Sequence, residues 1–232
     1  MITRRYSTTT RLLKKVTLNN AKGKSVSSQM WLQRQLSDPY VEKAKMLSYR
    51  CRSAFKLLEI DDKHKILRPE YTVIDCGCSP GSWSQVAAKR AKNGLVIGVD
   101  LQQVQPVEGA ILFGNTDFTS EAGQQKICDV LKDKRVNCVL SDMAPRATGI
   151  RQLDQENIMM LCYAVLRFAL TMSEEKASVL MKCWTNAEMQ ELVKRMECYY
   201  ETVKVVKPNA SRGDSAETFL LGKGFKGVTK VT

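Results

Sequence analysis

Short apolar runs alternate with amphipathic segments along most of the chain. The runs that predict strands lie at 72–76, 95–100, 110–113, 136–142 and 178–184. Between them, apolar residues three and four positions apart predict helices at 84–92, 121–132, 154–172 and 187–197. Two further runs, 199–206 and 216–221, predict a closing pair of strands. We therefore expect a single α/β domain over 38–232, with a mostly parallel sheet and an antiparallel closing strand.

The segment 43–59 predicts a helix with two unlike faces. One face is apolar and should pack on the sheet, and the other carries Lys45, Tyr49, Arg52 and Lys56 at the spacing of a 3.6-residue period. From composition alone, the simplest interpretation of the basic face is a solvated surface stripe. The alternative is a surface that contacts nucleic-acid phosphates.

After the strand at 72–76 the chain turns through Ser79-Pro80-Gly81 and opens a helix at Ser82. A strand, a tight turn and a helix in this order are typical of a nucleotide-binding sheet. The spacing is not that of a dinucleotide site, because Pro80 takes part in the turn and Asp75 precedes Gly77. A pyrophosphate prefers bare amides at a helix N-terminus, whereas a cationic ligand gains from a carboxylate. The turn therefore favours S-adenosyl-L-methionine and a methyltransferase.

Three acids follow predicted strands, namely Asp100, Asp117 and Asp142. Ligands bind at the edge where the carboxyl ends of parallel strands meet. Asp100 suits ribose hydroxyls, and Asp117 suits an adenine amino group with Phe118 packed on the ring. Any one of them alone would be interpreted as a turn or helix-capping aspartate, but three in register favour a nucleoside pocket. A NAD-dependent dehydrogenase would make similar contacts, yet its glycine fingerprint is missing.

Two charged residues interrupt apolar strands. Lys182 lies within Ser-Val-Leu-Met-Lys-Cys-Trp, and Glu217 begins Glu-Thr-Phe-Leu-Leu. A buried charge without a partner is costly, so each of these side chains requires a partner or a function.

The formal charge of +12 is concentrated at the N-terminus. Residues 1–37 contain eight Lys or Arg and no acid, which leaves 28 bases and 24 acids, or +4, in the remainder. This basic, hydroxyl-rich leader is typical of a mitochondrial import sequence, and a basic arm that contacts RNA is the alternative. No apolar stretch is long enough to cross a bilayer.

The cysteines and the histidine argue against a metal site. Eight cysteines include no Cys-x-x-Cys pair, and His64 is the one histidine. A zinc site would need paired ligand clusters, and a serine or cysteine triad would need a histidine near its nucleophile. We expect reduced thiols, no metal, and acid–base chemistry by Lys, Asp or Glu.

Taken together, five segments resemble the FtsJ family of ribose 2′-O-methyltransferases over about residues 30–225. They are Ser53-Ala-Phe-Lys-Leu-Leu-Glu-Ile, the turn from Asp75, Ser141-Asp-Met-Ala-Pro, Met181-Lys, and Lys207-Pro-Asn-Ala-Ser-Arg followed by Ser-Ala-Glu. The resemblance implies a Rossmann-like, S-adenosylmethionine-dependent methyltransferase fold. It also implies a Lys–Asp–Lys–Glu tetrad at Lys56, Asp142, Lys182 and Glu217. The implied cofactor residues are Gly77, Pro80, Gly81, Ser82, Trp83, Asp100, Asp117, Phe118 and Asp142.

By the same resemblance, Lys182 is the candidate base for a ribose hydroxyl, and stabilising the developing alkoxide is its alternative role. The acceptor would be RNA, contacted by Lys45, Arg52, Lys56, Arg146, Lys207 and Arg212. The implied target is a uridine of mitochondrial large-subunit rRNA in a pre-ribosomal particle, methylated by a monomer in the matrix. A tRNA methyltransferase and a ribosome-assembly factor with dispensable catalysis are the alternatives. Ser82 and Arg146 depart from residues common in the family, which bears on substrate detail.

Overall fold

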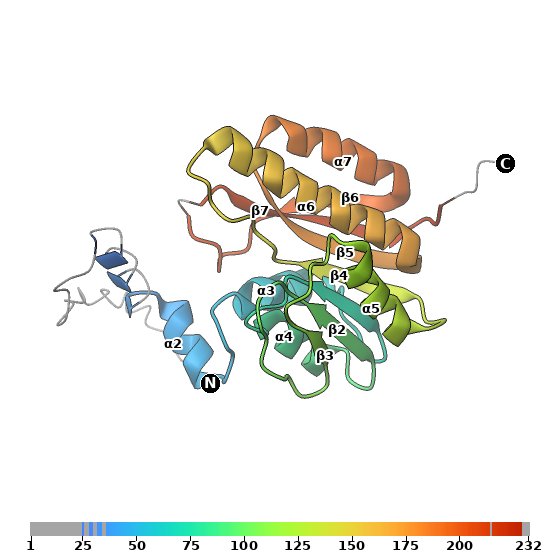
Figure 1. Ribbon diagram of the computed structural model, residues 1–232, viewed down its shortest axis with the longest axis horizontal. Coiled ribbons are helices and arrows are strands. Elements are labelled where there is room, and N and C mark those ends of the chain that lie inside the picture. Colours follow the sequence, from blue (N-terminus) through green and yellow to red (C-terminus); the bar gives the residue numbers. More distant parts are fainter. Residues whose placement is uncertain (1–24, 26–27, 30–31, 34–35, 214, 229–232) are drawn as a thin grey trace, which may run out of the picture.

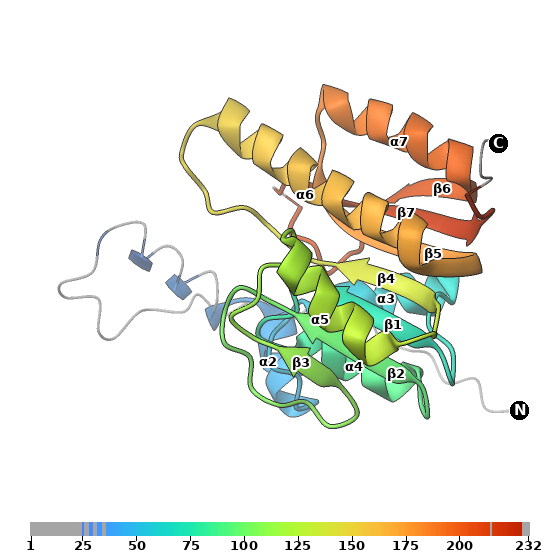
Figure 2. The same ribbon diagram turned by 45° about the vertical axis from the view of Figure 1, so that its right-hand side comes forward.

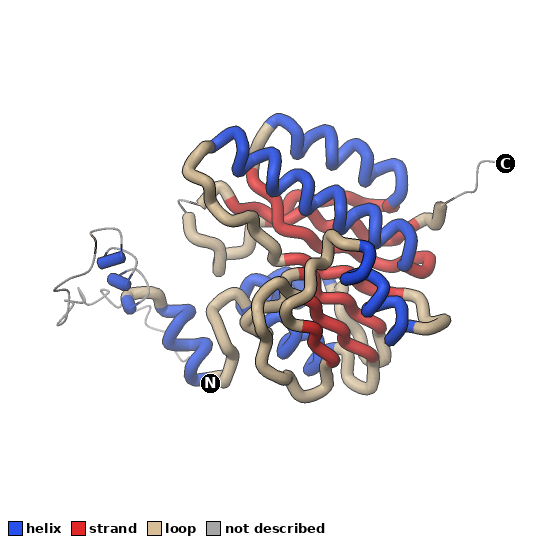
Figure 3. The backbone as a smooth tube through the Cα atoms, in the orientation of Figure 1, coloured by secondary structure: helices blue, strands red, loops and turns tan. Residues whose placement is uncertain are grey.

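Seven strands form one mixed sheet in the order β3-β2-β1-β4-β5-β7-β6 (Figures 1 and 3). In the computed structural model the strands are β1 Thr72–Cys76, β2 Leu95–Val99, β3 Ile111–Phe113, β4 Val136–Ser141, β5 Ser173–Trp184, β6 Tyr200–Val206 and β7 Glu217–Phe225. The five strands from β3 to β5 are parallel, and β7 inserts antiparallel between β5 and β6. The predicted mostly parallel sheet with an antiparallel closing strand is confirmed.

Helices cover both faces of this sheet (Figure 2). Their bounds are α2 Pro39–Met46, α3 Ala54–His64, α4 Ser82–Arg90, α5 Glu121–Leu131, α6 Arg151–Met172 and α7 Ala187–Tyr199. Side chains of α5, α6 and α7 share one buried cluster with the sheet, and those of α3 and α4 share another. Successive residues of a strand point to opposite faces, so Ile74 joins the first cluster and Val73 the second.

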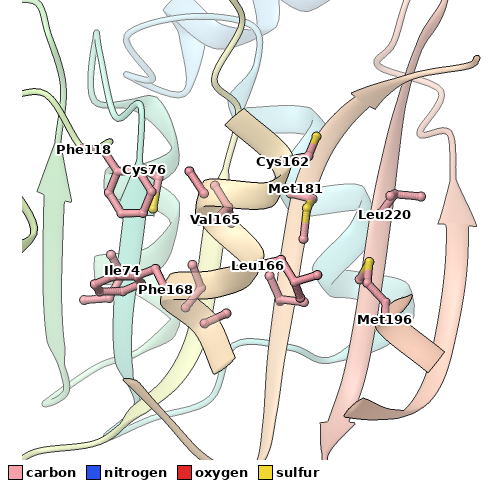
Figure 4. Packing of buried hydrophobic residues seen from close by; sticks show 14 of the residues in the cluster. Ile74, Cys76, Phe118, Cys162, Val165, Leu166, Phe168, Met181, Met196 and Leu220 are labelled. Atoms are coloured by element: carbon pink, nitrogen blue, oxygen red, sulfur yellow. The ribbon is translucent and has the colours of Figure 1, made fainter. Parts of the chain in front are cut away.

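The longest helix, α6, anchors the first cluster. Val165 and Phe168 are almost fully buried, and Figure 4 shows them packed toward the sheet. The ring of Phe168 meets that of Phe118 edge to face, with the centroids 5.3 Å apart. This contact fixes the loop after β3, which carries Asp117, against α6.

The predicted helix 43–59 is wrong in one respect, because the chain breaks into α2 and α3 between Met46 and Ala54. Ser48 adopts a positive φ of 58°, and the carbonyl of Ser48 accepts a hydrogen bond from Gln85 Nε2 at 3.0 Å. Gln85 Oε1 in turn accepts from the backbone amide of Arg50 at 3.0 Å. Contacts with α4 therefore stabilise the break, and Lys45 and Lys56 do not share one helical face.

The structure describes residues 25, 28–29, 32–33, 36–213 and 215–228. The predicted leader 1–37 lies largely outside these residues, so its targeting role stays a prediction. None of the described helices has the length and hydropathy that a membrane span requires. All eight cysteines are free thiols, and within the described part of the chain no His, Cys, Asp and Glu side chains group as they would around a metal ion.

Candidate active site

Strand register brings the predicted site residues to one edge of the sheet. Ser141, the last residue of β4, is level with Cys76 of β1 and Met181 of β5. Asp142 follows directly after Ser141, and Lys182 follows Met181. Because β7 runs antiparallel, its first residue, Glu217, pairs with Trp184 at the carboxyl end of β5. Residues far apart in sequence thus meet where ligands bind in this class of sheet.

The four predicted tetrad residues form one ion-paired cluster. Lys56 Nζ, from α3, lies 2.7 Å from each carboxylate oxygen of Glu217 and 3.9 Å from Asp142 Oδ1. Lys182 Nζ lies 2.9 Å from Asp142 Oδ1 and 3.9 Å from Glu217 Oε2. It also donates a hydrogen bond of 2.7 Å to the carbonyl oxygen of Asp142. Two cations and two anions therefore alternate within direct contact.

Burial makes this pairing necessary. The four side chains are only 10–16% exposed, and an unpaired charge at such a site would be strongly disfavoured. Burial by itself raises the pKa of Glu217. The charges of Lys56 and Lys182, together with hydrogen bonds from Lys56 and Ser211, outweigh burial and lower that pKa overall. Glu217 is therefore a carboxylate near neutral pH.

A cavity of about 890 Å³ opens beside the cluster. Its walls include predicted cofactor residues that follow four strands, β1 to β4, namely Gly77, Asp100, Asp117, Phe118 and Asp142. Asp142 thus belongs both to the cavity and to the tetrad. The volume lies in the range of small-molecule sites, roughly 300–1,000 Å³. Carboxylates and an aromatic ring in the wall suit a cationic nucleoside such as S-adenosyl-L-methionine.

Asp100 joins two walls of the cavity. Its Oδ2 accepts a hydrogen bond of 2.8 Å from the amide of Ser79, and its Oδ1 accepts one of 2.7 Å from the amide of Gln102. The turn at Gly77 allows a close approach, because Gly77 has a φ of +77° and a Cβ there would collide with Met143. The residues that would hold the cofactor are thus supported by the backbone around them.

Asp75 does not serve as the cavity carboxylate that the sequence favoured. It is fully buried, and its Oδ2 accepts a hydrogen bond of 2.6 Å from Ser84 Oγ. Burial, together with the negative charges of Asp142 and Asp100, raises the pKa of Asp75 to about 7, although the Ser84 hydrogen bond opposes this shift. Asp100 and Asp142 line the cavity in its place.

Four predicted cofactor residues, Pro80, Gly81, Ser82 and Trp83, do not line the cavity. The Trp83 ring is buried in the second cluster, 5.7 Å from Phe219, and its Nε1 donates to the carbonyl of Ser53 at 2.9 Å. Ser82 Oγ lies 2.8 Å from Ser53 Oγ. Ser82 and Trp83 therefore connect the turn to Ser53, which precedes α3. The cofactor role of all four residues stays a prediction.

The predicted RNA-binding residues separate into two groups. Lys45 and Arg146 are exposed, and Arg146 lies at the cavity. Arg52 instead lies 3.0 Å from Asp38 Oδ2 and donates to the carbonyl of Ala210 at 2.6 Å. Lys56 is buried in the tetrad.

The remaining two predicted RNA contacts also have partners within the chain. Lys207 Nζ donates to the carbonyl of Ser215 at 2.8 Å, and Arg212 lies 3.7 Å from Asp38. The expectation of one helical face that carries Lys45, Arg52 and Lys56 is wrong, because the helix breaks between Met46 and Ala54 and because Arg52 and Lys56 contact acceptors within the chain. The RNA contacts themselves stay a prediction.

The sequence analysis missed two polar residues of this region. Ser211 Oγ donates to Glu217 Oε1 at 2.8 Å, and the guanidinium of Arg50 contacts carbonyls around the cofactor turn. Neither has a local signal, since serine in a loop and arginine before a helix are ordinary surface residues.

Comparison with known proteins places the chain in a family. The FtsJ-like methyltransferase family matches residues 49–225. A Drosophila melanogaster protein, "rRNA methyltransferase 2, mitochondrial", is 57% identical over 219 residues, which cover 90% of this chain and 88% of the relative. A "Ribosomal RNA large subunit methyltransferase E" of Parvibaculum lavamentivorans is 42% identical over 92% of this chain and 87% of its own length.

Among solved structures, a putative ribosomal RNA methyltransferase from Plasmodium falciparum superposes with a TM-score of 0.69 at 26% identity. The alignment covers 78% of this chain and all of that structure. The matched region contains the turn after β1, the cavity and all four residues of the ion-paired cluster. The chain belongs to the FtsJ-like methyltransferase family.

Proposed function

We propose that the protein transfers the methyl group of S-adenosyl-L-methionine to the 2′-hydroxyl of a uridine in large-subunit rRNA. The observation that carries this proposal is the double position of Asp142, which lines the cavity and contacts Lys182 in the tetrad. A methyl donor in the cavity would therefore lie next to a hydroxyl held at Lys182 and Lys56. Such proximity is what a direct displacement between two bound molecules requires.

The residue types support a specific chemistry. When bound, S-adenosyl-L-methionine would supply a methyl group carried on a sulfonium, with S-adenosylhomocysteine as the leaving group. A ribose hydroxyl is a weak nucleophile, so a base must take its proton during attack. In this proposal Lys182 first releases the proton of its ammonium to solvent and then takes the hydroxyl proton, and Asp142 and Glu217 stabilise the ammonium that forms again. Lys56 and Ser211 hold Glu217 in place.

The relatives' names support the substrate class. They specify ribosomal RNA, and two of them, from Drosophila melanogaster and Caenorhabditis elegans, specify the mitochondrion. This favours rRNA over tRNA, and the mitochondrial matrix as the location. A charge of only +4 outside the leader suits a folded pre-ribosomal particle better than a short RNA, because few phosphate contacts are available. We propose that the enzyme acts as a monomer.

Mapping of 2′-O-methyl groups tests the proposal. Large-subunit rRNA from mitochondria with and without the protein should differ by one uridine, and wild-type protein should restore the modification. Lys182→Ala should not restore it. A full 2′-O-methyl map in cells without the protein would contradict the proposal. Normal subunit assembly without methylation, in cells that express Lys182→Ala, would separate catalysis from an assembly role.

A further inference from the structure

Arg50 joins two backbone segments that flank the cofactor cavity. Its Nη1 donates hydrogen bonds to the carbonyl of Pro80 at 2.8 Å and to that of Gln105 at 2.7 Å. Its Nη2 donates to the carbonyl of Pro106 at 2.5 Å. Pro80 belongs to the turn before α4, whereas Gln105 and Pro106 belong to the loop between β2 and β3. One guanidinium therefore satisfies three carbonyl oxygens from two separate segments.

Residues of the same two segments line neighbouring parts of the cavity wall. Ser79 lies on the turn, Leu101 and Gln102 lie on the loop, and all three line the cavity. On the cavity side Asp100 joins them through the amides of Ser79 and Gln102. Arg50 joins them a second time through carbonyl oxygens. Asp100 is also the residue expected to bind the ribose of a ligand, so its hydrogen bonds to the two segments could change when a ligand binds. Arg50 does not line the cavity, so its hydrogen bonds to the two segments would be kept.

The local structure is built around the guanidinium. Gly81 has a φ of +110°, and a Cβ at that position would lie 2.5 Å from Arg50 Nη1. The amide of Arg50 donates to Gln85 Oε1 at 3.0 Å, which fixes the start of its side chain relative to α4. A planar fork of donors can reach several carbonyl oxygens at once, whereas a lysine ammonium is a single point of contact. Arg50→Lys should therefore keep the charge and lose part of the connection.

We propose that Arg50 is a positioning residue that fixes the separation of the two cavity walls and thereby sets the affinity for the methyl donor. Its guanidinium binds backbone carbonyls, and Arg50 itself is not among the residues that line the cavity. The identity of the ligand rests on the proposed function. Because the tetrad lies on α3, β5, β7 and the residue that follows β4, loss of the Arg50 connection should change cofactor binding more than the chemical step.

The test is calorimetric titration of S-adenosyl-L-methionine and S-adenosylhomocysteine into wild type and Arg50→Lys. Loss of a hydrogen bond from a charged donor changes an equilibrium constant roughly tenfold or more. We therefore expect Arg50→Lys to bind both ligands about tenfold more weakly than wild type does. KM for the methyl donor should rise similarly, with kcat within about twofold. Amide hydrogen exchange should become faster at 101–107. Arg68→Lys, an exposed arginine outside the cavity, is the matched control and should bind like wild type.

The outcomes are distinguishable. If wild type binds neither ligand, the proposed function fails. If wild type binds and Arg50→Lys binds within twofold, with unchanged exchange at 101–107, the role of Arg50 is overturned. Arg50→Ala with added ethylguanidinium is the second variant: recovery of ligand affinity would support positioning by the guanidinium, and a folded variant without recovery would contradict it.

Discussion

Glu217 and Asp75 are two acids of the same sheet, the first partly and the second fully buried, and they differ in their partners. Both carboxyls lose water, which disfavours the ionised form. Glu217 has Lys56 at 2.7 Å and Lys182 at 3.9 Å, and its pKa is lowered in spite of burial. Asp75 accepts hydrogen bonds from Ser84, whereas the charges that act on it are the carboxylates of Asp142 and Asp100, and its pKa is raised to about 7.

The difference separates the two halves of the site. On the acceptor side, Lys56 and Lys182 lower the pKa of Glu217, so this acid is ionised between two lysines. On the donor side, Asp75 accepts a hydrogen bond from Ser84 of α4 and is partly protonated near neutral pH. The negative charge that the cavity offers to a cationic ligand comes from Asp100 and Asp142. Burial alone therefore does not decide the role of an acid; its cationic neighbours do.

Lys182→Ala gives the largest expected effect, because it removes the proposed base on the acceptor side. General-base catalysis contributes roughly 10²–10⁴-fold, so we expect methyl transfer to fall about 10³-fold. Binding of S-adenosyl-L-methionine should stay within about threefold, since Lys182 is not among the residues that line the cavity. Single-turnover methylation and calorimetry measure the two quantities. Lys134→Ala, exposed in the α5–β4 turn, is the control, and turnover by Lys182→Ala close to that control would refute the assignment.

Asp75→Asn tests the donor side. The folded state holds a proton on Asp75 up to about pH 7, whereas an unfolded aspartate releases it near 3.8. Stability should therefore decrease as pH rises between these values and level off above, by an amount on the order of 4 kcal/mol. The amide cannot ionise and still accepts from Ser84, so the variant should lose this decrease. Urea unfolding from pH 4 to 9 measures it, with exposed Asp133→Asn as control; parallel curves for Asp75→Asn and wild type would contradict the pKa assignment.

Glu217→Gln should have the opposite effect to Asp75→Asn on how the free energy of unfolding depends on pH. A carboxyl with a lowered pKa stabilises the folded state above its unfolded pKa, and this contribution is lost as pH falls through the folded pKa. The variant should lack that loss at acid pH. It should also transfer methyl groups roughly 10–100-fold more slowly, because Lys56 loses its charged partner. Unfolding at pH 3–6 and turnover at pH 7.5 measure the two effects. Wild-type values for both would show that Glu217 is dispensable, and exposed Glu188→Gln controls for the amide.

Arg52→Gln gives the smallest expected effect and tests whether this arginine acts within the chain. Its side chain is 17% exposed, pairs with Asp38 and donates to the Ala210 carbonyl. Loss of these contacts should lower the free energy of unfolding by about 1–2 kcal/mol. RNA affinity, measured by filter binding at several salt concentrations, should keep its salt dependence. If the slope of log affinity against log salt concentration fell by about one, Arg52 would instead contact a phosphate. Exposed Arg68→Gln is the matched control.

The positions of the strands and most of the candidate site residues could be predicted from the sequence. Apolar runs located the strands, most clearly β1, β2 and β4, which are buried on both faces and therefore show a continuous apolar pattern. Asp100, Asp117 and Asp142 could be assigned to one edge because parallel strands end together. Lys182 and Glu217 could be identified because a charge within an apolar strand is rarely tolerated without a partner.

The contacts between distant segments could not be predicted and are seen in the folded chain alone. Gln85 stabilises the break in the predicted helix 43–59, the Ala210 carbonyl turns Arg52 inward, and Pro80 and Gln105 bind Arg50. Lys56 and Lys182, the cations that lower the pKa of Glu217 and have no counterpart beside Asp75, likewise come from other elements. Local patterns report the preference of a segment for helix or strand and for burial. They do not report which donor or acceptor from elsewhere in the chain will reach a side chain, and that partner sets its charge and its role.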